Sequence, residues 1–343
     1  MTEWCGSLNY MPRKARIDAP GAIHHVICRG LERREIFWDD PDRDSFVIRL
    51  GDVIKQTSTR CFAWVLIPNH FHLLLQTGVV PIATVMRRLL TGYAVVFNRR
   101  HNRVGHVFQN RYKSILCQAE PYLLELVRYI HLNPLRAGIV TSMTQLGTYR
   151  YSGHCQILGT GTEPWQTTED VLLRFGDSTM EAREKYTAFV AEGIEVGKRP
   201  ELTGGGLVRS AGGWQSLLTA QRAGVFLKSD ERILGDSDFV EAVLGAAEEQ
   251  IEKKTVWERE GYGLEQAAQR AAELLHMNVE EVLLHRKKPT TVEARSLLCF
   301  FATREMGISA TAVALSLGLS LSAVTRGTCR GERIVAERGW QLK

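Results

Sequence analysis

The residues Trp64-Val-Leu-Ile-Pro-Asn-His-Phe-His-Leu-Leu-Leu-Gln76 predict a strand and hold the strongest chemical signal in the chain. Side chains alternate between the two faces of a strand, so His70 and His72 point the same way, about 7 Å apart along it. Phe71 and the leucines that follow point to the opposite face. We therefore expect one apolar, packed face and one face with two imidazoles placed to share a metal ion. Two incidental strand histidines are the alternative.

The residues around this stretch alternate between strand and helix signals. Residues 23–28 predict a first strand, and residues 61–76 predict a second, longer one. Pro68 limits that strand to a sheet edge, a bulge or two segments, because proline cannot donate to the ladder. Helical spacing predicts helices over 45–57, 82–99 and 120–133, and residues 105–116 predict a loop and a strand. This order fits an α+β sandwich with helices on one face of a small antiparallel sheet.

Length and composition bound the class of protein. At 343 residues the chain has room for two or three domains. No apolar run approaches the roughly 20 residues of a membrane span, and the N-terminus lacks the apolar core of a signal peptide. The seven cysteines are scattered, without a CxxC pair. They predict reduced thiols in a cytoplasm, with neither a disulfide framework nor a zinc finger.

Charge is segregated along the chain. Residues 1–160 hold 20 Lys and Arg against 11 Asp and Glu, residues 161–284 hold 13 against 23, and residues 285–343 hold 10 against 4. Two basic ends therefore flank an acidic middle. This pattern indicates two surfaces that meet a polyanion, and chance segregation is the alternative.

Tyr129 and Asn133 lie four residues apart in the third predicted helix, so they share one helical face. A tyrosine hydroxyl beside a metal-held phosphate is a competent nucleophile, because the cation stabilises charge on the phosphoryl oxygens. Asn133 could supply an oxygen as a third ligand. The alternative is a core-facing tyrosine, with Asn133 capping the helix before Pro134.

A basic and aromatic set of residues predicts contacts to DNA. Arginine and lysine hold phosphates, while aromatic rings offer stacking platforms for unpaired bases. A merely solvated positive loop is the alternative. The predicted contacts in this half are Arg87, Arg88, Arg99, Arg100, Arg103, Arg111, Tyr112 and Lys113.

Several motifs, in this order, resemble those of the single-tyrosine HUH transposases, and most of all the branch associated with repetitive extragenic palindromes (REP). They are Met11-Pro-Arg-Lys, Pro20-Gly-Ala-Ile-His-His-Val, Pro68-Asn-His-Phe-His-Leu-Leu, Gly105-His-Val-Phe-Gln-Asn-Arg-Tyr-Lys and Tyr129-Ile-His-Leu-Asn-Pro-Leu-Arg-Ala-Gly138. The resemblance covers roughly residues 11–155. It implies a ferredoxin-like α+β domain, often dimeric, that cuts and rejoins single-stranded DNA at hairpins.

The resemblance assigns roles residue by residue. His70 and His72 match the metal ligands, and the ion would be Mg²⁺ or Mn²⁺. Tyr129 matches the nucleophile, and Asn133 matches the position that completes the metal site. The implied reaction is attack of Tyr129 on a scissile phosphate, which forms a 5′-phosphotyrosine and frees a 3′-OH without ATP. The remaining histidines are expected to be structural, and they include His24, His25, His101, His106 and His131.

The C-terminal residues predict a helix-turn-helix. A helix over 291–306 should end at Gly307, Ser309 can cap a helix over 310–316, and Ser320 or Ser322 can cap a third helix that runs to about residue 329. This segment is similar to the DNA-binding domain of the replication initiator DnaA, and a helical dimerisation module is the alternative. The predicted contacts to bases or phosphates are Ser322, Thr325, Arg326 and Arg330.

These observations predict a ferredoxin-like HUH transposase domain over 11–157, an acidic, mostly helical connector over 158–255, and a DnaA-like helical domain over 256–343. The expected function is a metal-dependent single-strand DNA nickase and strand transferase at palindromic hairpins. The alternative is a DNA-binding regulator of repeat elements whose catalysis is dispensable. The expected partners are DNA hairpins, duplex DNA at the C-terminal domain and a second copy in a homodimer, with no membrane. The expected location is the cytoplasm, with the nucleoid.

Overall fold

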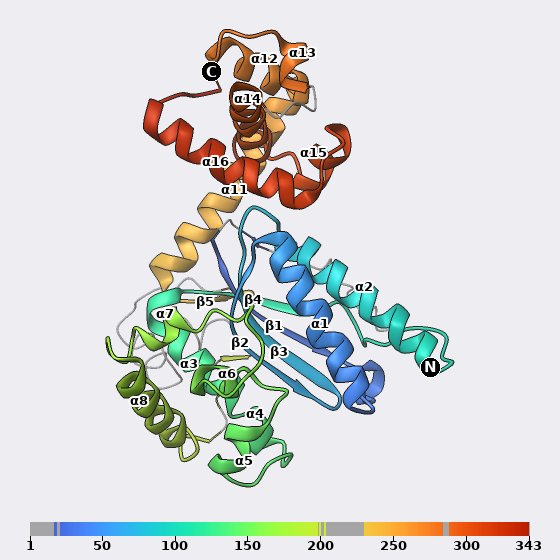
Figure 1. Ribbon diagram of the computed structural model, residues 1–343, viewed down its shortest axis with the longest axis vertical. Coiled ribbons are helices and arrows are strands. Elements are labelled where there is room, and N and C mark those ends of the chain that lie inside the picture. The colour runs from blue at the N-terminus through green and yellow to red at the C-terminus, as the bar shows by residue number, and fades with distance from the viewer. Residues whose placement is uncertain are drawn as a thin grey trace, which may run out of the picture.

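The computed structural model describes residues 17–18, 21–197, 199, 202–203, 230–283 and 288–342. A sheet with helices on both sides forms the lower part of the molecule in Figure 1, and a helical unit that ends the chain lies above it. The motif that begins at Met11 lies outside the described residues. So does Pro20, the first residue of the next motif.

The sheet has five strands in the order β2-β3-β1-β4-β5. Neighbouring strands are antiparallel except β4 and β5, which are parallel. The strands are β1 (Ile23–Arg29), β2 (Arg60–Ile67), β3 (His70–Gln76), β4 (Lys113–Cys117) and β5 (Ile233–Leu234). The first six long elements follow the order β-α-β-β-α-β of the ferredoxin-like motif. The α+β prediction is confirmed, and the sheet is mixed rather than purely antiparallel.

Pro68 divides the predicted long strand into two segments. Residues 68 and 69 form the turn between β2 and β3, which then pair with each other from Ile67 opposite His70 to Arg60 opposite Gln76. The carbonyl of Pro68 accepts the backbone N–H groups of Ile36 and Phe37 at 2.7 and 3.1 Å. Proline therefore sits where no ladder hydrogen bond is required of it.

One face of the sheet is apolar and is covered by α1 (Asp40–Thr57) and α2 (Ile82–Arg100). Phe71 of β3 is fully buried there, and its ring centroid lies 4.8 Å from that of Phe46 in α1. Helix α1 begins earlier than predicted, because Asp39 is its N-cap and accepts the backbone N–H of Asp42. A short 3-10 turn, η1 (Leu31–Arg33), precedes it.

The other face is covered by α3 (Ala119–His131), so the expectation of helices on one face only is wrong (Figure 1). Helix α3 ends at His131, and the short helix α4 (Asn133–Arg136) follows with Pro134 in its first turn, where proline is tolerated. The core on this side also takes in α6 (Gly153–Leu158), α7 (Glu169–Leu172) and α8 (Thr179–Glu192). Helix α5 (Met143–Thr148) precedes α6.

A buried polar cluster joins α8 to this core. The hydroxyl of Tyr186 lies 2.7 Å from Nδ1 of His131 and 2.8 Å from Nδ1 of His154. All three side chains are at most 1% exposed. The structural unit around the sheet therefore extends past residue 157, and the first part of the predicted connector belongs to it.

The C-terminal unit follows α11 (Ser237–Arg259), the long helix that leads away from the sheet in Figure 1. Its elements are α12 (Leu264–Leu274), α13 (Val279–Leu283), α14 (Pro289–Phe300), the π-helix η3 (Phe301–Glu305), α15 (Ala310–Ser316) and α16 (Leu321–Arg338). The predicted helix end and helix caps are confirmed. Gly307 has the left-handed φ of +68°, and the hydroxyls of Ser309 and Ser320 cap α15 and α16.

Helix α16 runs nine residues further than predicted. Gly331 does not end it, because a Cβ at this position would lie 2.2 Å from the carbonyl oxygen of Ser296 in α14. The glycine instead lets the two helices approach closely, and Gly339, with φ of +66°, ends α16. The bend from α15 to α16 is 109°, inside the range of about 90–120° found in helix-turn-helix units.

Among the described residues, no single helix is long and apolar enough to cross a membrane. The bent pair α15 and α16 passes the length and composition test only when both helices are counted together.

Candidate active site

His70 and His72 lie on the face of the sheet that α3 covers. His72 faces Ile27 of β1 and Val65 of β2 across the ladders. It is 4% exposed, whereas His70 at the start of β3 is half-buried. The two ring centroids are 5.2 Å apart. With metal–nitrogen bonds of about 2.1 Å, two imidazoles on one ion have ring centres roughly 4.6–5.3 Å apart, so this pair fits a shared cation.

Tyr129 reaches this pair from α3. Its ring meets that of His72 edge-on, with centroids 5.9 Å apart and an interplanar angle of 76°. The side chain is half-buried. The structure therefore brings together the predicted nucleophile and the predicted ligand pair, which are almost 60 residues apart in the sequence.

His25 is a third imidazole in this cluster. It lies on β1, is fully buried, and its Nε2 is 3.0 Å from Nδ1 of His72. Its ring centroid is 6.0 Å from that of Tyr129. The sequence analysis predicts a structural role for His25. The register that sets it diagonally beside His72 joins two strands far apart in the chain, so alternation along one strand does not reveal this neighbour. His24, its neighbour, lies on the opposite face and contacts Asp18 and Ser114.

The imidazoles of the site are neutral near pH 7. Burial lowers the pKa of His70 to about 4, and the charge of Arg29 lowers it further. Burial lowers the pKa of His25 to about 4 as well, and that of His72 well below its usual value. A neutral imidazole is the form that binds a metal ion.

Asn69 fixes the orientation of His70. Its amide nitrogen donates to the carbonyl of Arg33 at 3.2 Å, so the other amide atom, the oxygen, is the one 2.6 Å from Nδ1 of His70. Nδ1 of His70 must then carry the hydrogen, and Nε2 keeps a lone pair for a ligand.

Two arginines that were not predicted from the sequence stand beside the cluster. Arg29 is exposed and is the cross-strand partner of His70. The guanidinium of Arg136 lies 5.1 Å from the centroid of the Tyr129 ring. It also lies 3.4 Å from the Tyr129 carbonyl. A cation over a phenol favours its ionised form. Both arginines fall within or next to the quoted motifs, but no periodicity marks them.

Asn133 has a clear structural role. Its amide nitrogen donates to the carbonyls of Tyr129 and Ile130 at 3.1 and 3.3 Å, which caps the end of α3. Among the described residues, no hydrogen bond or ring contact joins it to His70 or His72. Likewise, within the described ranges no three His, Cys, Asp or Glu side chains are grouped to hold an ion. Asn133 as third ligand therefore stays a prediction.

Most of the predicted DNA contacts lie away from this cluster. Arg87, Arg88, Arg99 and Arg100 belong to α2, on the opposite face of the sheet. Arg100 is paired with Asp39 and Asp42, and Arg103 stacks over Trp38 and Phe97. Arg111 is exposed in the loop before β4. Lys113, opposite Ile27, shares the face of His72, and its ammonium donates to the Thr203 carbonyl.

Three of the predicted DNA-contacting residues make contacts inside the protein. Tyr112 is 8% exposed in the apolar core, so its ring is not an open stacking platform. Thr325 is fully buried, and its hydroxyl donates to the carbonyl of Leu321. Ser322 donates to the carbonyl of Gln56 in α1 and so joins the C-terminal unit to the sheet unit. Arg326 and Arg330 are exposed on α16.

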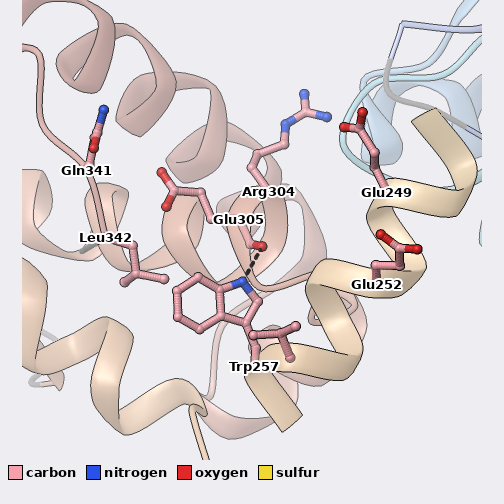
Figure 2. A pocket seen from close by; sticks show the side chains of 8 residues that line it. Glu249, Glu252, Trp257, Arg304, Glu305, Gln341 and Leu342 are labelled. Atoms are coloured by element: carbon pink, nitrogen blue, oxygen red, sulfur yellow. Dashed lines mark hydrogen bonds between the residues drawn. The ribbon is translucent and has the colours of Figure 1, made fainter. Parts of the chain in front are cut away.

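A cavity of about 740 Å³ lies elsewhere, between α11 and the end of the chain (Figure 2). The indole of Trp257 donates to the carbonyl of Glu305 there at 3.1 Å. Its charged lining is mainly acidic, with Glu249, Glu252 and Glu305 against Arg304. This cavity therefore does not suit a phosphate backbone.

Residues 20–133 match the family model described as "Transposase IS200 like". The matched residues are similar to this family, and they include His25, the histidine pair and Tyr129. One solved structure, of a REP-associated tyrosine transposase bound to a REP hairpin, aligns with 46% of this chain and 92% of its own. The identity is 17% and the TM-score 0.37. A comparison with curated proteins finds no match.

Proposed function

We propose that this protein is a metal-dependent single-strand DNA nickase and strand transferase that acts at palindromic hairpins. One observation carries the proposal. The phenol of Tyr129 and the imidazoles of His70 and His72 meet on one sheet face, inside a domain that matches IS200-like transposases. That combination unites a nucleophile with a pair of neutral ligands.

In the proposed reaction, the phenolic oxygen of Tyr129 attacks the phosphorus of a scissile phosphate. The phenol loses its proton as the new bond joins its oxygen to phosphorus. The bond from phosphorus to the 3′ oxygen breaks, and the released oxygen takes up a proton, so no net proton is gained or lost. The product is a 5′-phosphotyrosine and a free 3′-OH. Attack by a 3′-OH on the phosphotyrosine reverses these changes and restores the phenol, so no ATP is needed.

The donor set suits Mg²⁺ or Mn²⁺, with His70 and His72 as ligands and Asn133 as the proposed third one. When bound, the cation would reduce the negative charge on the phosphoryl oxygens. Arg136 would favour ionisation of Tyr129 through its place over the ring. Arg29, exposed beside His70, would contact the incoming backbone phosphate.

The C-terminal unit would contribute duplex binding through a helix-turn-helix formed by α15 and α16. The exposed Arg326 and Arg330 support this proposal, as does the 109° bend. The three-domain division and a possible homodimer also stay proposals. A boundary after β5, rather than at residue 157, agrees better with the packing of α8 on the sheet unit and with the pairing of β5 to β4.

A covalent adduct assay tests the function. DNA hairpins with single-stranded flanks, labelled at either the 3′ or the 5′ end, are incubated with the full chain and Mn²⁺ or Mg²⁺. Attack by Tyr129 predicts that the 3′ label moves with the protein, while the 5′ label appears on a shorter strand that a polymerase can extend. Tyr129→Phe should abolish both products, and Tyr122→Phe, on the same helix, serves as the matched control.

Two other outcomes would support different functions. Retarded binding without an adduct for the natural chain would favour the DNA-binding regulator. Cleavage that persists in Tyr129→Phe would favour a phosphodiesterase that uses water.

A further inference from the structure

His25 is the one member of the imidazole cluster to which the proposed reaction gives no task. Its ring lies between His72 on the neighbouring strand and the backbone of Leu202, from the segment predicted as a connector. Nδ1 of His25 is 3.3 Å from the carbonyl oxygen of Leu202, and Nε2 is 3.0 Å from Nδ1 of His72. Both ring nitrogens are therefore engaged, so His25 has none left to bind a cation or move a proton.

The direction of this hydrogen-bond chain can be deduced. A carbonyl oxygen only accepts, so Nδ1 of His25 carries the hydrogen. In a neutral ring the other nitrogen, Nε2, is then an acceptor, and the hydrogen between the two rings must belong to Nδ1 of His72. Nε2 of His72 is left with its lone pair, just as Asn69 leaves the lone pair on Nε2 of His70.

We propose that His25 is a positioning residue that, together with the Leu202 carbonyl, holds His72 in the tautomer and orientation a metal ligand needs. This rests on the proposed function, because it assumes that His70 and His72 bind the ion. Metal-bound histidines generally donate their second N–H to a fixed acceptor, a part that Nε2 of His25 plays for His72, and loss of such an acceptor typically costs about 10–100-fold in metal affinity. The burial of His25 and of Leu202, which is 1% exposed, keeps water from replacing either group.

The two ligands are thus supported differently. His70 is half-buried and held by a neighbour in the sequence, while His72 is held by a buried ring from another strand. His24 provides a matched control for His25. It is the adjacent residue on β1 and equally buried, but it points to the opposite face.

Two measurements on the full chain test the proposal. Long-range ¹H–¹⁵N NMR of the metal-free chain should show hydrogen on Nδ1 of both His25 and His72. Hydrogen on Nε2 of His72 would overturn the relay without any variant. Mn²⁺ affinity, measured by electron paramagnetic resonance, should fall about 10–100-fold in His25→Leu. It should recover to within a few-fold in His25→Gln, whose amide can accept from His72, and stay unchanged in His24→Gln.

The same titration separates failure of the relay from failure of the proposed function. If His70→Ala weakens Mn²⁺ binding and a folded His25→Leu does not, the relay is wrong and the metal site stands. If His70→Ala and His72→Ala both leave Mn²⁺ affinity unchanged, the proposed function loses its metal site, and the relay fails with it.

Discussion

Alternate residues of the same strands build two different faces of the sheet. The face that carries Phe71 is an apolar core, and the face that carries His72 holds the candidate active site. On the Phe71 side, aromatic and aliphatic side chains of α1, α2 and β3 form a continuous core. On the His72 side, α3 covers the sheet but brings the Tyr129 phenol against the rings of His25 and His72, and the guanidinium of Arg136 in α4 lies over that phenol.

The difference separates stability from chemistry within one strand. Side chains on the apolar face gain free energy by burial alone. Imidazoles on the polar face lose hydration when buried, and they are retained by specific hydrogen bonds. Substitutions on the first face should therefore alter folding, and substitutions on the second should alter the reaction.

The largest expected effect is on strand cleavage. His72→Ala should reduce adduct formation to background, a loss of at least about 1,000-fold, because it removes a ligand from the site. Binding of a DNA hairpin in the absence of metal should change less than a few-fold. Gel-based cleavage and binding assays on the same preparation check both. Loss of cleavage and binding together would instead mean that His72 serves folding.

The reverse effect is expected on the other face. Phe71→Ala should lower the free energy of unfolding by about 3–5 kcal/mol, because it empties a fully buried ring site. His70→Ala, next to it on the strand but half-buried, should cost less than about 1 kcal/mol. Urea titration followed by circular dichroism measures both. Equal costs for the two variants would remove the distinction between the faces.

A smaller effect concerns pH. Burial lowers the pKa of His154 to about 4 and that of His131 well below its ordinary value. In the unfolded chain these two histidines titrate near pH 6.5. Between this pH and their lowered pKa values, the unfolded chain therefore binds more protons than the folded chain. Stability should be constant above this pH and fall as the pH drops from 6.5 toward 4. Each such histidine lowers the free energy of unfolding by up to about 1.4 kcal/mol for each pH unit of this fall.

The matched variant for this prediction is His154→Gln, which keeps a hydrogen-bonding group beside Tyr186. Its free energy of unfolding, measured by urea titration from pH 7 to 4.5, should depend less steeply on pH than that of the natural chain. An unchanged slope would show that His154 does not carry this dependence.

The smallest effect is expected at the C-terminal unit. Replacing Arg326 and Arg330 together with alanine should weaken duplex binding and reduce its salt slope by about 2, because each arginine that binds a phosphate adds about 1 to that slope. Fluorescence anisotropy at several salt concentrations measures the slope. Arg338→Ala, at the far end of α16 and paired with Glu293, is the control. An unchanged slope in the double variant would argue against the helix-turn-helix.

The sequence predicted those features of the site that depend on residues close together in the chain, and it missed those that depend on distant residues. Strand alternation placed His70 and His72 on one face, and local capping signals located α15 from its serine cap onward. Neither signal could reveal the pairing of β1 with β3, so His25 was missed. The same applies to the Leu202 carbonyl, which lies 177 residues from His25 in the chain.

Helix faces were harder to predict than helices. The sequence predicted α2 and its arginines, but the fold sets α2 on the face of the sheet opposite to Tyr129. Thr325 was predicted to contact DNA, but its side chain is packed inside the C-terminal unit. Which side of a helix meets its neighbours depends on the tertiary structure, and one sequence alone did not provide it.

The site of covalent attachment to DNA identifies the nucleophile most directly. After reaction with a DNA hairpin, trypsin should release residues 129–136 as a peptide with one tyrosine, Tyr129. Mass spectrometry should find this peptide linked to a nucleotide 5′-phosphate. Attachment to any other tyrosine, or cleavage with this peptide always unmodified, would show that Tyr129 is not the nucleophile.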